Sequence, residues 1–531
     1  MKIKLEFNNA FKWYHKEHVY SIGYIIKDNT IIQGEDLLQF LEKIQDVEKL
    51  EQVLKTIEGY FSFVMYIQNK WIIVSDIIRS FPVFYQTDGN ETMITDKIEN
   101  FENRIINEDK VKEFLVLGYV IGQETLYTGI KQIENAQIVT LTETGRIDAY
   151  RYYNYQYQIK DDEDEKLIKK LDALYDKAIK NLILFLNGRR AVIPLSGGQD
   201  SRLIAYYLTK NGYKNIIAYT YGKKDNPEAI VSKKVAEFLN IDWYFVEYKN
   251  SSMRKKFYDK KMYSDMADYC ARGFSVTHIQ EWEAIIQLKE KGLVHGGDVV
   301  IPGFSGDFIA GSHLNVEMIQ KKEYTYKDFK EYIFKKHYKI YPWRKRDKEH
   351  KLELKLWSDA KKSLDIQKKD NDTMTEVEFN CLFERFDFQE RQVKFISNSV
   401  RTYDLLGLQW YMPFWDKELM TYWLSIPLEK RCKRKLYDKF VDVIYGDLMR
   451  YAPIAVVKQP KNYTNKLCKK IQGIKKLYTY YFTHFLNYYG YIKFKDFLKY
   501  CFQYETGSYY FMFSYQYINY IRKRELKNEK S

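Results

Sequence analysis

The fold is decided by one stretch of the chain, Val192-Ile193-Pro194-Leu195-Ser196-Gly197-Gly198-Gln199-Asp200-Ser201-Arg202. Its apolar beginning predicts a short buried strand, and the apolar residues at 203–208 predict that a helix follows. Two adjacent glycines between them let backbone N–H groups approach a polyanion closely. The N-terminus of the following helix adds unpaired donors and a favourable dipole. This stretch therefore predicts a phosphate-binding loop.

The polar residues of this loop indicate the kind of phosphate compound. Ser196 and Ser201 supply hydroxyl donors, and Asp200 supplies a hard oxygen ligand for Mg²⁺ that bridges phosphates. The G-x-x-x-x-G-K-[ST] pattern of kinase-like γ-phosphate sites is absent. The alternative is a simple Gly-Gly turn, capped by Asp and Ser, before a helix. The full S-G-G-x-D-S pattern between a strand and a helix favours the phosphate site.

The segments around the loop predict two kinds of domain. Ala191–Leu195 and Ile216–Thr220 are short apolar runs, each followed by a helical pattern, which is typical of a doubly wound parallel sheet. Residues 1 to about 150 alternate short β-rich runs with turn residues and predict a sheet-rich domain. The charged run Lys160–Lys166 reads as a linker or helix start, and helical patterns dominate from about residue 315.

Residues Ser196–Ser201 resemble the pyrophosphate loop of the N-type ATP pyrophosphatases. The order of further segments is similar to that of the class B asparagine synthetase family over roughly residues 50 to 440. These segments are Gly59–Val64 with Asp76 and Phe81–Tyr85, Tyr219–Gly222, Pro302–Gly311, Met412–Asp416 and Lys433–Tyr437.

The resemblance implies an α/β fold with three parts. Residues 1–155 would form a degenerate glutaminase-like domain of the Ntn type, with αββα layers. Residues 160–455 would form the ATP-pyrophosphatase (PP-loop) domain, an adenine nucleotide α-hydrolase-like, doubly wound parallel sheet with a helical extension. Residues 456–531 would form a basic, aromatic-rich helical segment.

The resemblance also implies a set of site residues. Asp200 and Asp307 would bind Mg²⁺, with Asp307 also counted as catalytic. Lys433 would contact phosphate and stabilise the reacting centre, with Lys435 as the competing register. ATP would be bound by Leu195, Ser196, Gly197, Gly198, Gln199, Asp200, Ser201, Tyr221, Gly222 and Gly303.

The chain departs from the family at both of its active sites. The family's glutaminase needs a cysteine as residue 2, whereas this chain has Lys2, and its first cysteine is Cys270. The amino-terminal domain is therefore expected to be a scaffold. Four residues that depart from the family's pattern around the synthetase site remove expected proton acceptors there: Phe304, Phe308, Gln409 and Tyr411. Histidines that could substitute are His278, His295 and His313.

The implied function is ATP-dependent amide formation. A carboxylate plus Mg-ATP would give acyl-AMP and pyrophosphate, and ammonia or an amine would then attack the acyl group. The carboxylate could belong to a small molecule such as an amino acid, to a uronic acid of a glycan, or to a peptide. One alternative is a non-catalytic nucleotide-binding scaffold. Another is an RNA-modifying adenylating enzyme, which the lack of a catalytic cysteine pair disfavours.

Charge and composition bear on location and partners. The five cysteines form no C-x-x-C pair, which fits a reducing cytoplasm, and no apolar run is long enough to span a membrane. Residues 431–531 contain 21 Lys and Arg against 7 Asp and Glu, and so account for the whole net charge of +14. Aromatic residues crowd the same segment between Tyr478 and Tyr520. It could be a helical cap on the synthetase domain, or a surface for acidic glycan or an anionic membrane. No nucleic-acid-binding module is recognised, so nucleic acid is not an expected partner.

The first testable prediction concerns the nitrogen source. The purified protein is expected to release no glutamate from glutamine, because Lys2 offers no thiol to attack the amide. A coupled glutamate assay measures this, with a cysteine-dependent glutaminase as the positive control. Any amide formation should depend on added ammonium or amine. Glutamate release by this protein alone would overturn the prediction.

Overall fold

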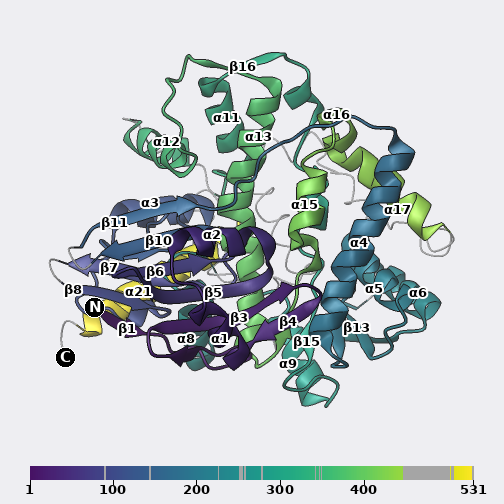
Figure 1. Cartoon of the computed structure of the whole chain (residues 1–531). Coiled ribbons are helices and arrows are strands. Elements are labelled where there is room, and N and C mark those ends of the chain that lie inside the picture. Colours follow the sequence, from purple (N-terminus) through teal and green to yellow (C-terminus); the bar gives the residue numbers. More distant parts are fainter. Residues whose placement is uncertain are drawn as a thin grey trace.

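The structure is a computed structural model with two large bodies and a separate carboxyl-terminal helix (Figure 1). It describes residues 1–88, 91–142, 145–224, 226–249, 255, 259–276, 279–340, 343–345, 347, 350–446, 503 and 508–528.

The amino-terminal body contains two β-sheets. The larger sheet has the strand order β11-β10-β6-β5-β3-β2, with β4 paired to β3, and the smaller has the order β1-β8-β7-β9. All strand pairs are antiparallel except β1 with β8. The strands are β1 Lys2–Lys4, β2 Tyr14–Lys16, β3 Val19–Lys27, β4 Thr30–Gln33, β5 Glu58–Ile67, β6 Lys70–Ser75, β7 Phe84–Asp88, β8 Glu91–Thr95, β9 Lys131–Gln132, β10 Gln137–Thr142 and β11 Ile147–Arg151.

Apolar residues on alternate positions of the larger sheet build two separate core layers. On one face, Phe61 and Phe63 pack with leucines of helices α1 (Gly34–Glu42) and α2 (Val47–Thr56). On the other face, Val64 joins side chains of the smaller sheet, such as Ile94. Helix α3 (Glu108–Leu117) contributes to the large core shared with the second body. The expected layered architecture of the amino-terminal part is thus confirmed.

The second body is built on a five-stranded sheet in which every pairing is parallel. Its order is β14-β13-β12-β15-β18, so the chain order reverses at β12. In such sheets ligands bind beyond the carboxyl ends of the strands, at the point of reversal. The strands are β12 Ala191–Pro194, β13 Ile216–Gly222, β14 Asp242–Glu247, β15 Val299–Val300 and β18 Gln409–Trp410. The predicted phosphate loop follows β12 directly, at that point.

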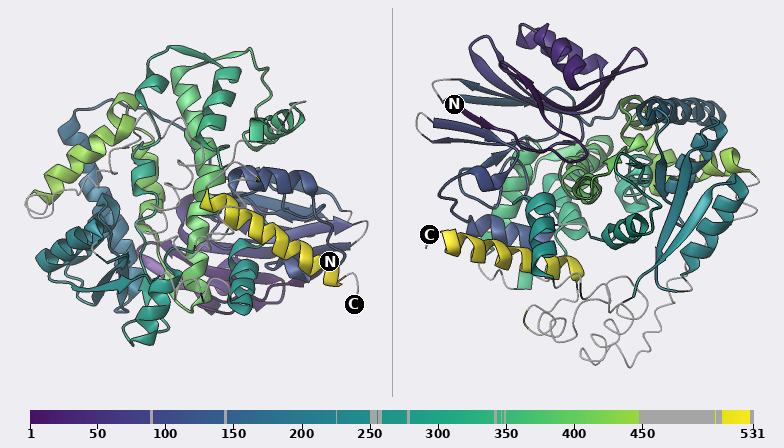
Figure 2. Two further views of the ribbon diagram at one scale, coloured as in Figure 1. Left: turned by 180° about the vertical axis from the view of Figure 1, so that it is seen from behind. Right: turned by 90° about the horizontal axis from the view of Figure 1, so that it is seen from below.

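Helices flank the parallel sheet and extend away from it (Figures 1 and 2). Two of them, α11 and α13, begin at reciprocal capping boxes, Thr325 with Asp328 and Thr375 with Glu378. Each capping threonine is the last residue of a strand, β16 (Glu323–Thr325) or β17 (Thr373–Thr375), and these two strands pair antiparallel. The helices are α4 Asp164–Leu186, α5 Gln199–Lys210, α6 Pro227–Leu239, α8 Lys260–Met266, α9 Trp282–Glu290, α10 Gly306–Ile309, α11 Tyr326–Lys336, α12 Lys351–Ser363, α13 Glu376–Phe386, α14 Arg401–Leu405, α15 Lys417–Trp423, α16 Leu428–Arg431 and α17 Lys435–Tyr445.

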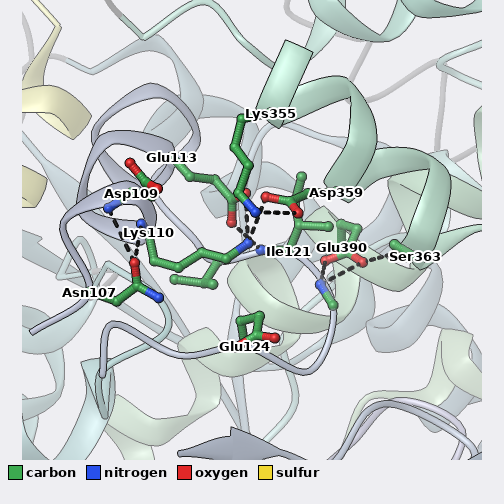
Figure 3. Close-up of polar contacts among 12 residues, drawn as sticks. Asn107, Asp109, Lys110, Glu113, Ile121, Glu124, Lys355, Asp359, Ser363 and Glu390 are labelled. Carbon is green, nitrogen blue, oxygen red and sulfur yellow. Dashed lines mark hydrogen bonds and ion pairs between the residues drawn. The ribbon is translucent and has the colours of Figure 1, made fainter. Parts of the chain in front are cut away.

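Buried polar contacts join the two bodies. Tyr60 of β5 donates its hydroxyl to the Met412 carbonyl at 2.6 Å, and both residues are buried. Further out, Lys110 of α3 donates to Glu113 at 3.1 Å and to Asp359 of α12 at 2.9 Å, so one ammonium bridges both bodies (Figure 3). This ion cluster lies at a polar cleft of about 640 Å³ between α3 and α12. Removing one member of such a buried cluster would leave uncompensated charge.

The described part of the carboxyl-terminal segment is helix α21 (Tyr509–Asn528), which packs against α3 (Figure 2). Tyr517 lies 5.8 Å from Phe114, ring centre to ring centre, and its hydroxyl accepts from the Gly273 N–H at 2.7 Å. Helix α21 therefore caps the amino-terminal body as well as the second one. The other aromatics that suggest an anionic surface lie mostly outside the described residues, and that surface stays a prediction. In the described part, no helix is long and apolar enough to cross a membrane.

Candidate active site

Two aspartates from separate loops meet at the carboxyl edge of the parallel sheet. The backbone N–H of Asp307 donates to Asp200 Oδ2 at 3.0 Å, and the Tyr437 hydroxyl donates to Asp200 Oδ1 at 2.6 Å. Burial and the negative charge of Asp307 raise the pKa of Asp200 to about 7. The two residues expected to bind Mg²⁺ are thus brought together, although they are far apart in sequence.

Glycines allow this close approach. A Cβ atom at Gly303 would lie 2.8 Å from the Ser201 nitrogen, and one at Gly306 would lie 2.8 Å from Asp200 Cγ. Real Cβ atoms essentially never come so near such atoms, so any side chain would force the loops apart. Gly303 therefore lies against the phosphate loop, as the sequence predicts. Gly306 is also needed as glycine, because a side chain there would clash with Asp200.

The phosphate loop is held in shape by its own side chains. Ser201 Oγ accepts from the Ser196 N–H at 3.1 Å, and Ser196 Oγ accepts from the Gly198 N–H at 3.1 Å. The buried Arg202 donates to the Gly197 carbonyl at 2.6 Å. Helix α5 begins at Gln199 without a side-chain cap. Its first N–H groups therefore retain capacity for an anion, and Gly198 in front of them is exposed.

The residues that are predicted to bind adenosine lie at the end of the neighbouring strand, β13. The Tyr221 ring stacks on Tyr248 with centroids 5.1 Å apart, and the Gly222 carbonyl accepts from the Tyr248 N–H at 2.7 Å. The Leu195 carbonyl accepts from the Thr220 hydroxyl at 2.6 Å, which ties the phosphate loop to β13. Tyr221, Gly222 and Leu195 therefore lie on the same edge as the aspartates.

The basic run before α17 has unusual backbone geometry. Lys433 and Arg434 have φ angles of 53° and 65°, in the left-handed region, which costs roughly 1–2 kcal/mol for each such residue. Lys433 and Lys435 are exposed, whereas Arg434 is partly buried and its charge lowers the pKa of Asp200. Arg434, which the sequence analysis does not single out, is therefore the cation of this run that acts on Asp200. The predicted role of Lys433 stays a prediction.

The residues present fit a magnesium ion that is shared with phosphates. Asp200 and Asp307 offer hard oxygen ligands, and among the described residues no group of three or more His, Cys, Asp or Glu could hold a metal by itself. Mg²⁺ commonly takes one or two carboxylates and completes its shell with phosphate oxygens and water. When bound, it would neutralise charge on the phosphates.

Three of the departures from the family pattern have side chains that contact the core or the amino-terminal body. Phe308 is fully buried and packs on Tyr155 in the core. Gln409 donates to the Ala10 carbonyl of the amino-terminal body at 2.9 Å. Tyr411 is buried and stacks over Tyr24, also of that body. These side chains serve the core and the interface between the bodies, because β18 lies against the amino-terminal body.

The three candidate histidines differ in where they are found. His295 is exposed in the turn that precedes β15, at the amino edge of the sheet, and its backbone N–H donates to Asp298. His278 lies outside the described residues. His313 follows Asp307 on the same loop and forms a hydrogen bond through Nδ1 with the buried Asp387. Only His313 is therefore found beside the site in the described part of the chain.

Comparison with known proteins gives one family. A family model described as asparagine synthase matches residues 187–464, just over half of the chain. The microcin J25-processing protein McjC of Escherichia coli is 22% identical over 246 residues, which are 44% of each chain. The matched region thus spans less than half the length of that relative.

Solved structures give weaker likenesses. The NH3-dependent NAD synthetase of Campylobacter jejuni, in complex with the nitrate ion, is 17% identical with a TM-score of 0.19, over 28% of this chain and 61% of that one. The glutamine phosphoribosylpyrophosphate amidotransferase of B. subtilis, complexed with ADP and GMP, is 9% identical with a TM-score of 0.17, over 58% and 60%. Similarity at this level bears on neither chemistry nor substrate.

The raised pKa of Asp200 predicts how the binding of Mg-ATP depends on pH. Mg²⁺ requires the ionised carboxylate, so binding of Mg-ATP is expected to weaken about tenfold per pH unit below pH 7. Calorimetric titration at pH 8, 7 and 6 measures this. The Tyr437→Phe variant removes a hydrogen bond that lowers the pKa, and should move the midpoint to higher pH.

The Asp200→Asn variant is the control for that titration, because any pH dependence it retains belongs to the nucleotide. It should also bind ATP without a magnesium requirement and keep the melting temperature of the wild type within a few degrees. Equal pH dependence in the variant and the wild type would contradict the assignment of Asp200.

Proposed function

Because the chain belongs to the asparagine synthase family, we propose that it is an ATP-dependent ligase that forms an amide from a carboxylate and ammonia or an amine. The observation that carries the proposal is the contact between Asp200 and Asp307 beside an uncapped helix N-terminus. The Asp307 backbone holds the Asp200 carboxylate, and the Asp307 charge acts on it, which favours a divalent cation, while the helix N-terminus favours phosphate. Together they support binding of a magnesium-bound triphosphate.

The proposed first step consumes ATP at its α-phosphorus. A carboxylate oxygen attacks that phosphorus, a new P–O bond forms, and the bond to the β-phosphate oxygen breaks. The products are acyl-AMP and pyrophosphate. The first N–H groups of α5 and the Ser196 hydroxyl would receive the pyrophosphate, and Arg434 would offset negative charge near Asp200.

The second proposed step forms the amide. The nitrogen of ammonia or an amine attacks the acyl carbon, and AMP leaves. The departing AMP carries the electron pair of the broken C–O bond, which makes an adenylate a better acyl donor than the free acid. Since Lys2 excludes the cysteine mechanism of nitrogen release, the nucleophile would come from solution or from the substrate itself.

A non-catalytic nucleotide-binding scaffold is the second candidate. Phe304 favours it, because the half-buried ring stands on the Asp307 loop where the family carries an acidic residue. The intact aspartate pair fits both candidates, since an enzyme and a nucleotide-binding scaffold would each bind Mg-ATP. The experiment below separates these candidates.

Pyrophosphate release from ATP should be measured across a panel of carboxylates: amino acids, nucleotide-linked uronic acids and peptides. Peptides belong in the panel because the relative in Escherichia coli is named for processing microcin J25. We expect one class to stimulate release, with AMP and pyrophosphate in equal amounts. Asp307→Asn should reduce this rate about 100-fold or more, because it removes one of the two proposed metal ligands.

Two outcomes would contradict the proposal. Formation of ADP and phosphate would mean attack at the γ-phosphorus, which is a different reaction. Tight binding of Mg-ATP without turnover on any carboxylate of the panel would favour the scaffold.

A further inference from the structure

A histidine–aspartate pair is connected to the loop that carries Asp307. The loop after β15 turns so that the Ser312 N–H donates to the Asp307 carbonyl at 3.0 Å, and His313 follows directly. The His313 ring packs edge-on against Phe308 with centroids 5.5 Å apart. Its side chain is 16% exposed, whereas Asp387, its hydrogen-bond partner, is fully buried. His313 is therefore the accessible member of the pair.

The structure holds Asp387 firmly in place. It opens a π-helical stretch, Asp387–Ile396, a feature that often occurs at functional sites. Gln392 of that stretch donates to Asp387 Oδ1 at 3.2 Å and accepts from the Ser305 hydroxyl at 2.8 Å. Ser305 is the residue from which helix α10, with Asp307, begins. Asp387 is therefore connected by hydrogen bonds to the loop that carries the proposed metal ligand.

Asp387 remains ionised. Burial alone would raise its pKa, but His313 and the cation of Arg391 hold that pKa well below its usual range. A carboxylate can only accept, so the hydrogen on His313 belongs on Nδ1, and the lone pair belongs on Nε2. Among the described residues no hydrogen-bond partner of Nε2 is found. Nε2 is therefore the ring nitrogen of His313 that a substrate could reach.

The surrounding charges tie this pair to the aspartates of the site. Burial lowers the pKa of Lys336, whereas the charges of Asp387 and Asp307 raise it, so both carboxylates act on the same ammonium. Arg391 Nη1 lies 4.0 Å from Asp387 Oδ1. His337 Nε2 lies 3.8 Å from Asp387 Oδ2, but His337 is fully buried, and burial lowers its pKa to about 3. His337 is therefore neutral and enclosed, and it cannot serve a substrate.

We propose that His313, positioned by Asp387, is the proton acceptor for the attacking amine, an inference that rests on the proposed function. As the neutral amine attacks the acyl carbon of the adenylate, a C–N bond forms, the C–O bond to AMP breaks, and AMP leaves with the electron pair. The nitrogen becomes positively charged on attack, and Nε2 of His313 takes its extra proton. The resulting imidazolium is stabilised by the carboxylate of Asp387, through the hydrogen bond at Nδ1.

This assignment defines the class of nucleophile as an ordinary amine or ammonia. Such a nucleophile must lose a proton after attack, and Phe304 offers no acceptor at the position where the family carries an acidic residue. His313, later on the same loop, would supply the base that Phe304 lacks. Hydroxylamine, a stronger nucleophile, depends much less on a base, and so provides a diagnostic probe.

The test separates the two half-reactions in purified full-length protein. The variants are His313→Asn and Asp387→Asn, with His295→Asn as the matched control at the amino edge of the sheet. Pyrophosphate release is measured with the most active carboxylate of the panel above. Amide formation is then measured with ammonium, and hydroxamate formation with hydroxylamine.

We expect both site variants to keep pyrophosphate release within about threefold of wild type. Amide formation from ammonium should fall by about 100-fold or more, and hydroxamate formation by less than about tenfold. The control should match the wild type in all three assays. Unchanged amide formation in His313→Asn would overturn the assignment. Absence of pyrophosphate release in the wild type would instead contradict the proposed function.

A spectroscopic readout tests the pair without any substrate. In protein labelled with ¹⁵N-histidine, the His313 resonances, identified by their loss in His313→Asn, should show hydrogen on Nδ1 and none on Nε2 at pH 8. Asp387→Asn should shift or exchange-broaden them, while His295→Asn should leave them unchanged. An Nε2–H form of His313 in the wild type would contradict the proposal.

Discussion

The contact between Asp200 and Asp307 is the constraint on which the rest of the second body depends. Two carboxylates repel each other, and partial burial makes the repulsion stronger. Here one backbone N–H and the hydroxyl of Tyr437 stabilise Asp200, and glycines at 303 and 306 leave room for the approach. The remaining negative charge of the two aspartates would be neutralised by a divalent cation. The protein thus provides a preorganised place for a metal and the phosphates it carries.

The sheet order explains why these loops meet. The chain reverses direction across the sheet at β12, so the loop after β12 and the loop after β15 leave neighbouring strands at the same edge. The amino-terminal body supports the far side of the sheet through Tyr60, which binds the Met412 backbone next to β18. The amino-terminal body therefore has a structural role in supporting the parallel sheet.

The sequence predicts local features of this site well and distant ones poorly. The loop Ser196–Ser201 is visible because its residues are adjacent, and Asp307 is visible through its family pattern. Tyr437 and Arg434 reach Asp200 from another helix, so only the folded chain shows their contacts. Gln409 contacts the amino-terminal body, and its motif alone does not tell which body its side chain faces.

Asp387 could not be found from sequence at all, because its importance comes from the partners that folding gives it. The π-helical stretch that holds it has no pattern distinct from an ordinary helix. The sequence does not distinguish among the three candidate histidines, and only the geometry favours His313. Fold class and the phosphate loop can thus be predicted from the sequence. The charges and hydrogen bonds around Asp200 and His313 depend on long-range packing and cannot.

The central claim is that the carboxylate attacks the α-phosphorus of ATP at the aspartate pair. It is tested most directly by supplying the active carboxylate with both oxygens labelled with ¹⁸O and analysing the products by mass spectrometry. Once the amide has formed, an acyl-adenylate route places one ¹⁸O atom in AMP and none in pyrophosphate. Label in inorganic phosphate, or AMP that carries no label when amide has formed, would contradict the account.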